Sequence, residues 1–160
     1  MVGHGVRERH LRGPTRVGAE PEEEVLFVRR YRCRACGAVM TVAPAQVLWR
    51  RLYATSAVVW ALSLYGVTKM AAAAVRQRIS PWRIVGATAA ASWQTLRRWS
   101  TCAGSGGFLP VRPIAHQSPR EAAGAVVMAL TARAPPTARS SSLAEQAVIG
   151  AQHSLMGIAP

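Results

Sequence analysis

A Cys-x-x-Cys-Gly turn between two short β-prone runs restricts the fold of this chain more than any other feature of its sequence. The two runs cover residues 25–31 and 38–42, and the cysteines between them are Cys33 and Cys36. Gly37 follows the second cysteine and supplies the positive φ that a tight turn of two thiolates needs. Such runs on either side of a turn are typical of a hairpin. The pattern therefore predicts a zinc-knuckle hairpin.

The cysteine pair supplies only half of a zinc site, because structural zinc is tetrahedral and takes four ligands. Three further candidates, His4, His10 and Cys102, have no spacing that makes them convincing partners for Cys33 and Cys36. Zinc is the one cofactor that the sequence suggests, at an incomplete site. A hairpin held by packing, with two reduced thiols, is the favoured interpretation. A thioredoxin-like redox role has less support than zinc binding, because no βαβ pattern surrounds the cysteine pair.

Basic residues dominate the middle of the chain. Residues 25–120 contain fourteen Lys or Arg and no acidic residue, and the whole chain has a formal net charge of +13 at pH 7. A segment without carboxylates cannot neutralise its arginines internally, so phosphate is the expected counter-charge. A basic patch of this kind is the electrostatic footprint of nucleic-acid binding. The sequence therefore predicts DNA as the partner and no small-molecule substrate.

The acidic residues argue against an enzyme. The chain has no Asp and seven Glu, of which four cluster within residues 20–24. Two-metal phosphoryl chemistry needs several carboxylates that converge on the ions, and this chain does not supply them. The motifs of phosphate-binding loops, serine hydrolases and zinc proteases are absent as well. We therefore expect a protein without enzymatic activity.

Short helices are expected after the hairpin. Apolar residues recur at three- and four-residue spacing over residues 46–65, which predicts a helix that Gly66 ends. A second helix is expected over residues 69–78, and the pair Ser80 and Pro81 is typical of the start of a third. Tryptophans at helix-periodic positions are expected in the core of this region, namely Trp60, Trp93 and Trp99.

The segment WQTLRRWS, residues 93–100, predicts an amphipathic helix that Ser92 caps. Trp93, Leu96 and Ser100 share its inner face. The residues expected to face outward and reach base edges are Gln94, Arg97 and Arg98. Several short helices joined by tight turns, the last with arginines in front, fit a helix-turn-helix. An arginine-bearing amphipathic helix is more often a solvated face, and only the acid-free surroundings reverse that preference here.

The chain changes character after the predicted helix-turn-helix. Residues 104–113 are linker-like, and two capping boxes that follow each predict the start of a helix. These boxes pair Ser118 with Glu121 and Ser142 with Glu145. We expect the two helices to end near residues 133 and 157. No constellation of side chains connects them to chemistry, so they are interpreted as packing elements or as a poorly ordered tail.

Together these segments predict a mainly α fold. A short β-hairpin zinc-knuckle remnant is followed by a small helix-turn-helix bundle and then by two C-terminal helices. The expected domains are a partial zinc-ribbon-like hairpin region over residues 1–44, a helix-turn-helix-like helical domain over residues 45–103, and a linker with C-terminal helices over residues 104–160. Residues 1–24, rich in Gly, Arg and Glu, are expected to form a loop with little core.

Four segments together resemble a known family. They read GHGVRERHLRGP near the start, RRYRCRACGAVMTVAP at the knuckle, RRLYATSAVVWALSLYG after it, and WQTLRRW. They are similar to the N-terminal zinc-ribbon and helix-turn-helix region of bacterial insertion-sequence transposases, over about residues 2–101. In relatives of this kind a first Cys-x-x-Cys lies upstream and completes the zinc site, and an acidic catalytic domain follows. The resemblance implies a truncated recognition module or remnant without strand-transfer activity.

The leading interpretation is therefore a DNA-recognition module. Arginines of the hairpin and of the segment after it are expected to contact phosphate, namely Arg29, Arg30, Arg32, Arg34, Arg50 and Arg51. No secretory signal follows Met1, so the expected location is the cytoplasm, on the nucleoid when the protein is bound to DNA. The target sequence and the oligomeric state are not set by the sequence.

Two rival interpretations remain open. Residues 52–67 are sixteen largely apolar residues flanked by Arg50, Arg51 and Lys69, as in a short membrane-inserted segment. This run is shorter than the roughly 20 residues that a span needs, so membrane association is disfavoured. The other rival is a nonfunctional fragment whose basic surface binds nucleic acid indiscriminately.

Overall fold

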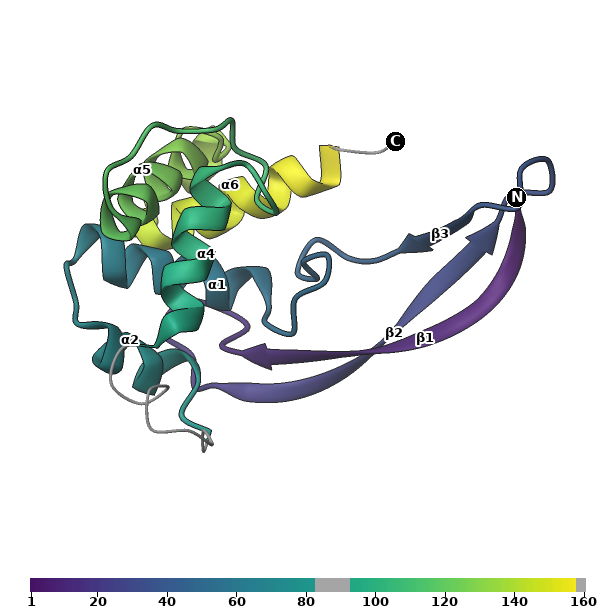
Figure 1. Ribbon diagram of the computed structural model, residues 1–160, viewed down its shortest axis with the longest axis horizontal. Coiled ribbons are helices and arrows are strands. Elements are labelled where there is room, and N and C mark those ends of the chain that lie inside the picture. Colours follow the sequence, from purple (N-terminus) through teal and green to yellow (C-terminus); the bar gives the residue numbers. More distant parts are fainter. Residues whose placement is uncertain (83–92, 158–160) are drawn as a thin grey trace.

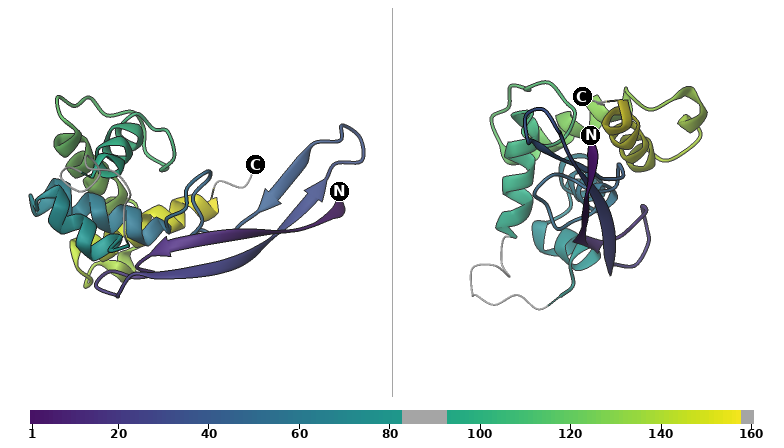
Figure 2. Two further views of the ribbon diagram at one scale, coloured as in Figure 1. Left: turned by 60° about the horizontal axis from the view of Figure 1, so that its bottom comes forward. Right: turned by 90° about the vertical axis from the view of Figure 1, so that its right-hand side faces the viewer.

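The structure combines a long antiparallel ribbon with a helical body from which the ribbon projects (Figures 1 and 2). The computed structural model describes residues 1–82 and 93–157. The ribbon consists of three strands, β1 (Val2–Gly13), β2 (Glu22–Arg32) and β3 (Val39–Val42). The helices of the body are α1 (Thr55–Leu62), the π-helix η1 (Ser63–Val67), α2 (Ala72–Ile79), α4 (Gln94–Gly104), α5 (Pro119–Thr131), the 3-10 helix η2 (Pro136–Ala138) and α6 (Leu143–Gly157).

The prediction of a mainly α fold is wrong. The described residues form helices together with a three-stranded antiparallel sheet, so the fold is mixed α and β. The difference arises in residues 1–24, which build β1 and the start of β2 instead of a loop. β1 pairs with β2 along its length, from Val2 opposite Arg32 to Gly13 opposite Glu22. Most residues of both strands are exposed, so their sequence lacks the apolar alternation that marks a half-buried strand.

Charge pairing lies where the acidic start of β2 meets β1. Glu23 is opposite Arg12, and their side chains form an ion pair of 3.2 Å. Glu23 also lies 3.4 Å from His10, and Glu22 accepts a hydrogen bond from the Thr15 hydroxyl. Exposed pairs of this kind contribute about 0–1 kcal/mol each. They therefore favour the observed register more than they stabilise the fold.

The predicted hairpin around the cysteines is present. β2 and β3 are antiparallel, with Arg32 opposite Val39. The Cys33 N–H donates to the Ala38 carbonyl at 2.8 Å, and Gly37 has a φ of +72°. The knuckle turn lies at the far tip of the ribbon, beside the N-terminus (Figure 1).

Strand alternation gives the ribbon two different faces. The face toward the body, here called the basic face, carries Arg7, Arg9, Arg30 and Arg32 around the buried side chain of Val28. The Arg9 guanidinium joins this face to the body, because it donates to two backbone carbonyls of the segment before α1. The opposite face, here called the outer face, has exposed apolar side chains between charged ones, namely Val6, Val25, Phe27 and Val42.

The ribbon is fixed to the body at the end of β1. Leu11 is buried in the core, and the Arg12 N–H donates to the Leu52 carbonyl at 2.7 Å. Gly13 has a φ of +95°, and a Cβ at this position would overlap the Cβ of Ala57 in α1. Glycine therefore suits both the backbone angle and the close approach of the ribbon to α1.

The first helix begins later than the sequence predicts. α1 starts at Thr55, and residues 46–54 form a loop, here called the 46–54 loop, that packs against the basic face of the ribbon. The Thr55 hydroxyl closes this loop by donating to the Ala45 carbonyl at 2.7 Å. Leu48 inside the loop is 1% exposed. Its apolar side chain is buried as that of a core-facing helix residue would be, although the backbone here is not helical. Apolar spacing alone cannot separate such a loop from the helix that follows it.

The apolar run over residues 52–67 forms the centre of the body. Every residue from 54 to 66 is buried, and α2, α4, α5 and α6 pack around this segment. Within residues 1–82 and 93–157, no helix has both the length and the apolar content needed to span a bilayer.

Gly66 has a different role from the predicted helix stop. It lies inside η1, which continues to Val67. A Cβ on Gly66 would overlap the backbone of α5 at Gly124, so this glycine permits the close crossing of η1 and α5. Packing between segments far apart in the chain, rather than local backbone preference, explains the residue.

The predicted tryptophan core is confirmed. Trp60, Trp93 and Trp99 are all buried, with exposures of 9%, 2% and 3%. Trp99 packs edge-to-face on Tyr53 and on Trp93, with ring centroids 4.8 Å and 5.3 Å apart. These contacts join α4 to the loop before α1.

Both predicted capping boxes are present. Ser118 accepts a hydrogen bond from the Glu121 N–H at 3.2 Å, and the Ser142 hydroxyl and N–H donate to Glu145 at 2.7 and 2.8 Å. The Ser142 hydroxyl, followed by its N–H, lowers the pKa of Glu145, because both donors favour the charged carboxylate. α5 ends slightly before residue 133, and both C-terminal helices contribute to the core, with Val126, Val127, Leu130, Ala147 and Ala151.

Part of the predicted helix-turn-helix falls outside the described residues. α2 covers Ala72–Ile79, close to the predicted 69–78, and Ser80 after it shares a 2.7 Å hydrogen bond with the Tyr53 hydroxyl. The third helix predicted after Ser80 and the predicted cap Ser92 lie in the undescribed stretch, residues 83–92. The turn that would precede α4 lies there too.

Candidate nucleic-acid interface

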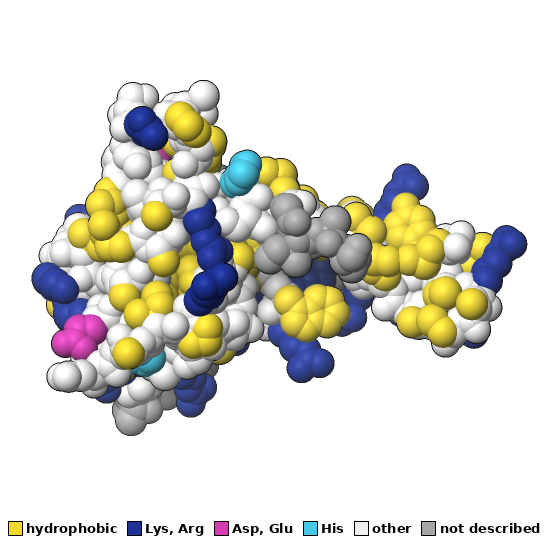
Figure 3. All heavy atoms as spheres, turned by 90° about the horizontal axis from the view of Figure 1, so that it is seen from above, with side chains coloured by type: hydrophobic (Ala, Val, Ile, Leu, Met, Phe, Trp, Pro, Cys, Tyr) yellow, Lys and Arg dark blue, Asp and Glu magenta, His cyan; other side chains and the backbone are white. Residues whose placement is uncertain are grey.

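Arginines without internal partners line the basic face of the ribbon. In the part of the chain that the structure describes, the side chains of Arg7, Arg30 and Arg32 form no hydrogen bond or ion pair. Alternate residues of a strand lie about 7 Å apart, so these charges are spread along a strip. The acidic residues on this face are Glu22 and Glu24, at the end nearest the body. Seen from above, the visible acidic side chains lie on the body, whereas Lys and Arg side chains lie on both the body and the ribbon (Figure 3).

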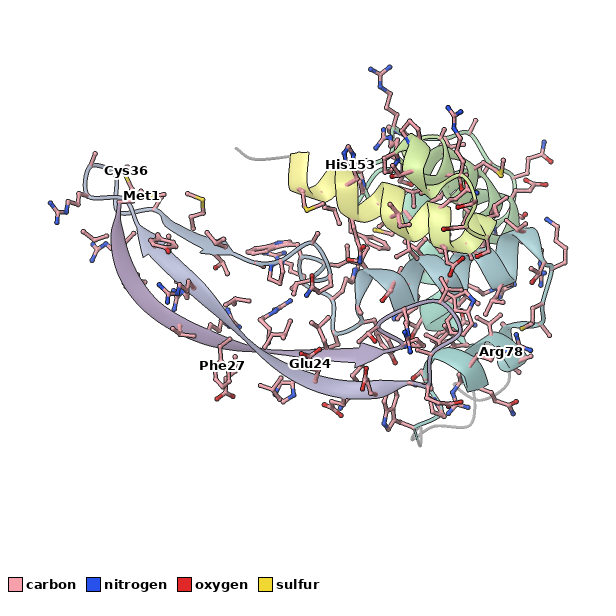
Figure 4. The ribbon with its side chains drawn as sticks, turned by 180° about the vertical axis from the view of Figure 1, so that it is seen from behind. Met1, Glu24, Phe27, Cys36, Arg78 and His153 are labelled. Carbon is pink, nitrogen blue, oxygen red and sulfur yellow. The ribbon has the colours of Figure 1, made fainter. Side chains whose placement is uncertain are left out.

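The arginines predicted to contact phosphate are distributed over different surfaces. Arg30 and Arg32 lie on the basic face, and Arg34 is exposed in the knuckle turn. Arg29 lies on the outer face, with Phe27, which points away from α6 (Figure 4). The ribbon therefore presents two of its four predicted arginines, Arg30 and Arg32, on the basic face.

Two neighbouring arginines of the 46–54 loop point in different directions. Arg50 has a φ of +56° and is exposed at the edge of the basic face. Arg51 is half-buried, stacks over the Phe108 ring at 4.6 Å and donates to the Cys102 sulfur at 3.5 Å. Arg51 is therefore held by the body, a difference that sequence adjacency cannot reveal.

The predicted base-reading residues are exposed on α4. Gln94, Arg97 and Arg98 face outward, whereas Leu96 and Ser100 are fully buried, as the helical spacing predicts. α4 belongs to the helical body, and the ribbon projects away from it (Figures 1 and 2). The two sets of basic residues thus come from different parts of the fold.

Three residues of the basic surface were missed at the level of sequence. Arg7 and Arg9 fall in a stretch predicted as loop, and Trp49 falls in a stretch predicted as helix. They line one pocket of about 370 Å³ at the base of the basic face, together with Arg50 and Val28. A signal was present, because Arg-x-Arg occurs both at residues 7–9 and at residues 30–32, as expected for two strands sharing a basic face.

The cysteine pair that the sequence predicts to be half of a zinc site lies at the tip of the ribbon (Figure 1). The backbone N–H groups of Cys36 and then Ala35 lower the pKa of the Cys33 thiol, because they favour its thiolate. Among the described residues, no third His, Cys, Asp or Glu joins the pair. His10 and Cys102 have other neighbours, a glutamate in the sheet and an arginine in the body. The described residues therefore offer two candidate zinc ligands and do not fit a complete structural site.

Comparisons of the chain with models of protein families, with curated proteins and with solved structures found no match. The function must therefore be inferred from the chemistry of the ribbon, the 46–54 loop and α4. Of these, the ribbon has the most distinctive charge arrangement.

Proposed function

We propose that this chain is a DNA-recognition module that binds duplex DNA with the basic face of its ribbon. One observation carries the proposal: the side chains of Arg7, Arg30 and Arg32 lie on one face of a projecting β-ribbon and have no hydrogen-bond or ion-pair partner among the described residues. Double-stranded DNA is a dense line of phosphate charge, and arginines that neutralise phosphates release condensed counterions. Unpaired arginines in an acid-poor strip are well suited to this partner.

The dimensions of the ribbon support duplex DNA. β1 has 12 residues and is therefore about 40 Å long, slightly more than one helical turn of B-DNA, which is about 34 Å. The major groove is about 12 Å wide and admits a two-stranded ribbon. Leu11 and Gly13 fix the base of the ribbon to the body, so the backbone that carries the ribbon's arginines is attached before binding.

α4 provides a second contact in this proposal. Phosphate contacts position a protein on the duplex, and contacts to base edges specify the sequence. The exposed residues Gln94, Arg97 and Arg98 are of the types that read adenine and guanine in the major groove. The resemblance of residues 2–101 to the recognition region of transposases supports DNA as the partner. The proposed activity is recognition alone, without strand transfer.

Salt-dependent binding tests this function. The double variant Arg30→Ala/Arg32→Ala removes two arginines of the basic face, and Arg112→Ala/Arg133→Ala removes the same charge from exposed positions of the body. Each lost phosphate contact should reduce the slope of log K against log salt by about 0.9, so about 1.8 for the ribbon variant. Fluorescence anisotropy with a labelled duplex measures both slopes. Equal slopes for the two double variants would remove the ribbon from the interface.

The role of α4 is tested in the same assay, after a preferred duplex has been selected from a random library. Arg97→Ala/Arg98→Ala should weaken binding to the preferred duplex more than to random duplex, since a good bidentate base contact contributes about 1–3 kcal/mol of discrimination. Equal losses on both DNAs, or failure to select any preferred duplex, would favour an indiscriminate nucleic-acid binder.

A further inference from the structure

A pocket with an unusual lining lies where the 46–54 loop meets the basic face. Its volume is about 370 Å³. β1 and β2 contribute Arg7, Arg9 and Val28, and the loop contributes Trp49 and Arg50. The lining therefore has three guanidinium groups, one large aromatic ring and no carboxylate.

Arg9 positions the loop side of this pocket. Its guanidinium donates to the Leu48 carbonyl at 3.4 Å and to the Arg51 carbonyl at 3.3 Å. The Leu48 side chain is anchored in the core at 1% exposure. The backbone on both sides of Trp49 and Arg50 is thus held, so these two side chains are presented to the pocket by a fixed segment.

Two features of the 46–54 loop are energetically unfavourable and are not needed in a loop that merely connects two elements. The Trp49 side chain is 70% exposed, although Leu48 beside it is buried. Arg50 adopts a φ of +56°, in the left-handed region that residues with a Cβ disfavour. Strained backbone of this kind tends to occur at functional sites. In the described residues the side chains of Arg7 and Arg50 also have no hydrogen-bond or ion-pair partner.

The chemistry of the lining defines the ligand. An exposed tryptophan ring offers a stacking platform for a flat ring, and guanidinium groups beside it bind phosphate. A nucleotide unit has both parts, and the volume falls in the usual range of small-ligand pockets, about 300–1,000 Å³. A base inside a regular duplex has both faces covered by its neighbours, so only an unpaired or extruded base can stack on a side chain.

We propose that this pocket binds one unpaired nucleotide of a DNA strand, with its base on Trp49 and its phosphate on Arg7 and Arg50. This assignment rests on the proposed DNA binding and extends it to a particular DNA structure. The duplex on one side of the unpaired nucleotide would continue along the basic face, past Arg30 and Arg32. The preferred target is then a duplex with a single unpaired nucleotide or a junction between duplex and single strand.

The experiment compares two labelled DNAs with the same paired sequence, one fully paired and one with a single bulged adenosine. Anisotropy titrations should show tighter binding of the bulged DNA. Trp49→Ala should weaken binding to the bulged DNA by about tenfold, the order expected for loss of one base–aromatic stack, and should leave the paired DNA nearly unchanged. Trp49→Phe keeps an aromatic ring and should retain most of the preference.

Leu52→Ala is the matched control, because Leu52 is an exposed apolar residue of the same loop outside the pocket lining. Circular dichroism and urea denaturation confirm that each variant is folded. Replacing the bulged adenosine with 2-aminopurine adds a direct readout, because stacking on Trp49 should quench its fluorescence in the wild type and not in Trp49→Ala.

The outcomes separate this inference from the proposed function. No preference for the bulged DNA, or equal losses for Trp49→Ala on both DNAs, would overturn the nucleotide pocket while duplex binding stands. Absence of binding to either DNA at low salt would overturn the proposed function itself. Tight binding of free adenosine monophosphate that depends on Trp49 would replace the DNA strand with a free nucleotide as the ligand and would also overturn the inference.

Discussion

The ribbon and the helical body differ in what holds them in place. In the body, every residue from 54 to 66 is buried, and the surrounding helices close over this segment. In the three strands, by contrast, only Leu11, Gly13 and Val28 are buried. The body is therefore stabilised by apolar burial, whereas the ribbon depends on backbone pairing and on its attachment to the body. Stability and binding should consequently be separable by substitution in this protein.

Two arginines of the body and two of the ribbon differ in the same way, because only the side chains of the former have partners among the described residues. In the body, Arg120 lies 4.2 Å over the Tyr65 ring and donates to the Tyr65 carbonyl at 3.0 Å. Arg51 is held in a similar way by Phe108. On the ribbon, the guanidinium groups of Arg30 and Arg32 have no hydrogen-bond or ion-pair partner in the described chain. A basic residue is thus a candidate for DNA contact only where the tertiary structure leaves its guanidinium unpaired.

The largest expected effect on stability comes from replacing one tryptophan of the body by alanine, compared with the same replacement in the 46–54 loop. Trp99→Ala removes a ring that is 3% exposed and packs on Tyr53 and Trp93, so it should lower the free energy of unfolding by about 3–5 kcal/mol. Trp49→Ala removes a ring that is 70% exposed and should change it by no more than about 0.5 kcal/mol. Urea denaturation followed by circular dichroism measures both. Similar losses for the two variants would mean that the loop is part of the stabilising core.

A smaller effect is expected from glycines. A Cβ on Gly150 in α6 would overlap the Leu130 carbonyl oxygen of α5, so Gly150→Ala should force these helices apart and cost about 1–3 kcal/mol. Gly3→Ala in β1 is the control, because nothing lies within 4 Å of the added methyl group. The urea midpoint should fall for the first variant and stay unchanged for the second. An unchanged midpoint for Gly150→Ala would show that the crossing of α5 and α6 is looser than described.

The smallest expected effect is the titration of the ribbon tip. Because N–H groups of Cys36 and Ala35 lower the pKa of Cys33, its alkylation by iodoacetamide should begin at lower pH in the folded protein than in urea. The lowered pKa also makes stability depend on pH. Above the ordinary thiol pKa, the Cys33 thiolate stabilises the folded tip, and this stabilisation is lost as the pH falls through the lowered pKa of the folded protein. Mass spectrometry of the modified peptide gives both pH profiles. Coincident profiles would contradict the knuckle geometry.

Local features were predictable from the sequence, because their interacting groups lie within a few residues of one another. Ser118 and Glu121 form their capping box across three residues, and the knuckle is closed between Cys33 and Ala38. The two faces of α4 follow from helical spacing alone, with Leu96 buried and Arg97 exposed. In each case the physical cause is a backbone conformation that the residues themselves favour.

The tertiary structure alone decided the strand at the N-terminus, the shape of the basic surface and the direction of each arginine. Val2 pairs with Arg32, thirty positions away in the sequence. Both strands are largely exposed, so their sequences lack the apolar alternation that would have predicted the pairing. The nucleotide pocket joins β1 to the loop at Trp49. The sequence by itself determined the acid-free charge, the knuckle and the helix caps, because these depend on composition and near neighbours. Pairing and burial between distant segments depend on how the chain packs, which no local pattern records.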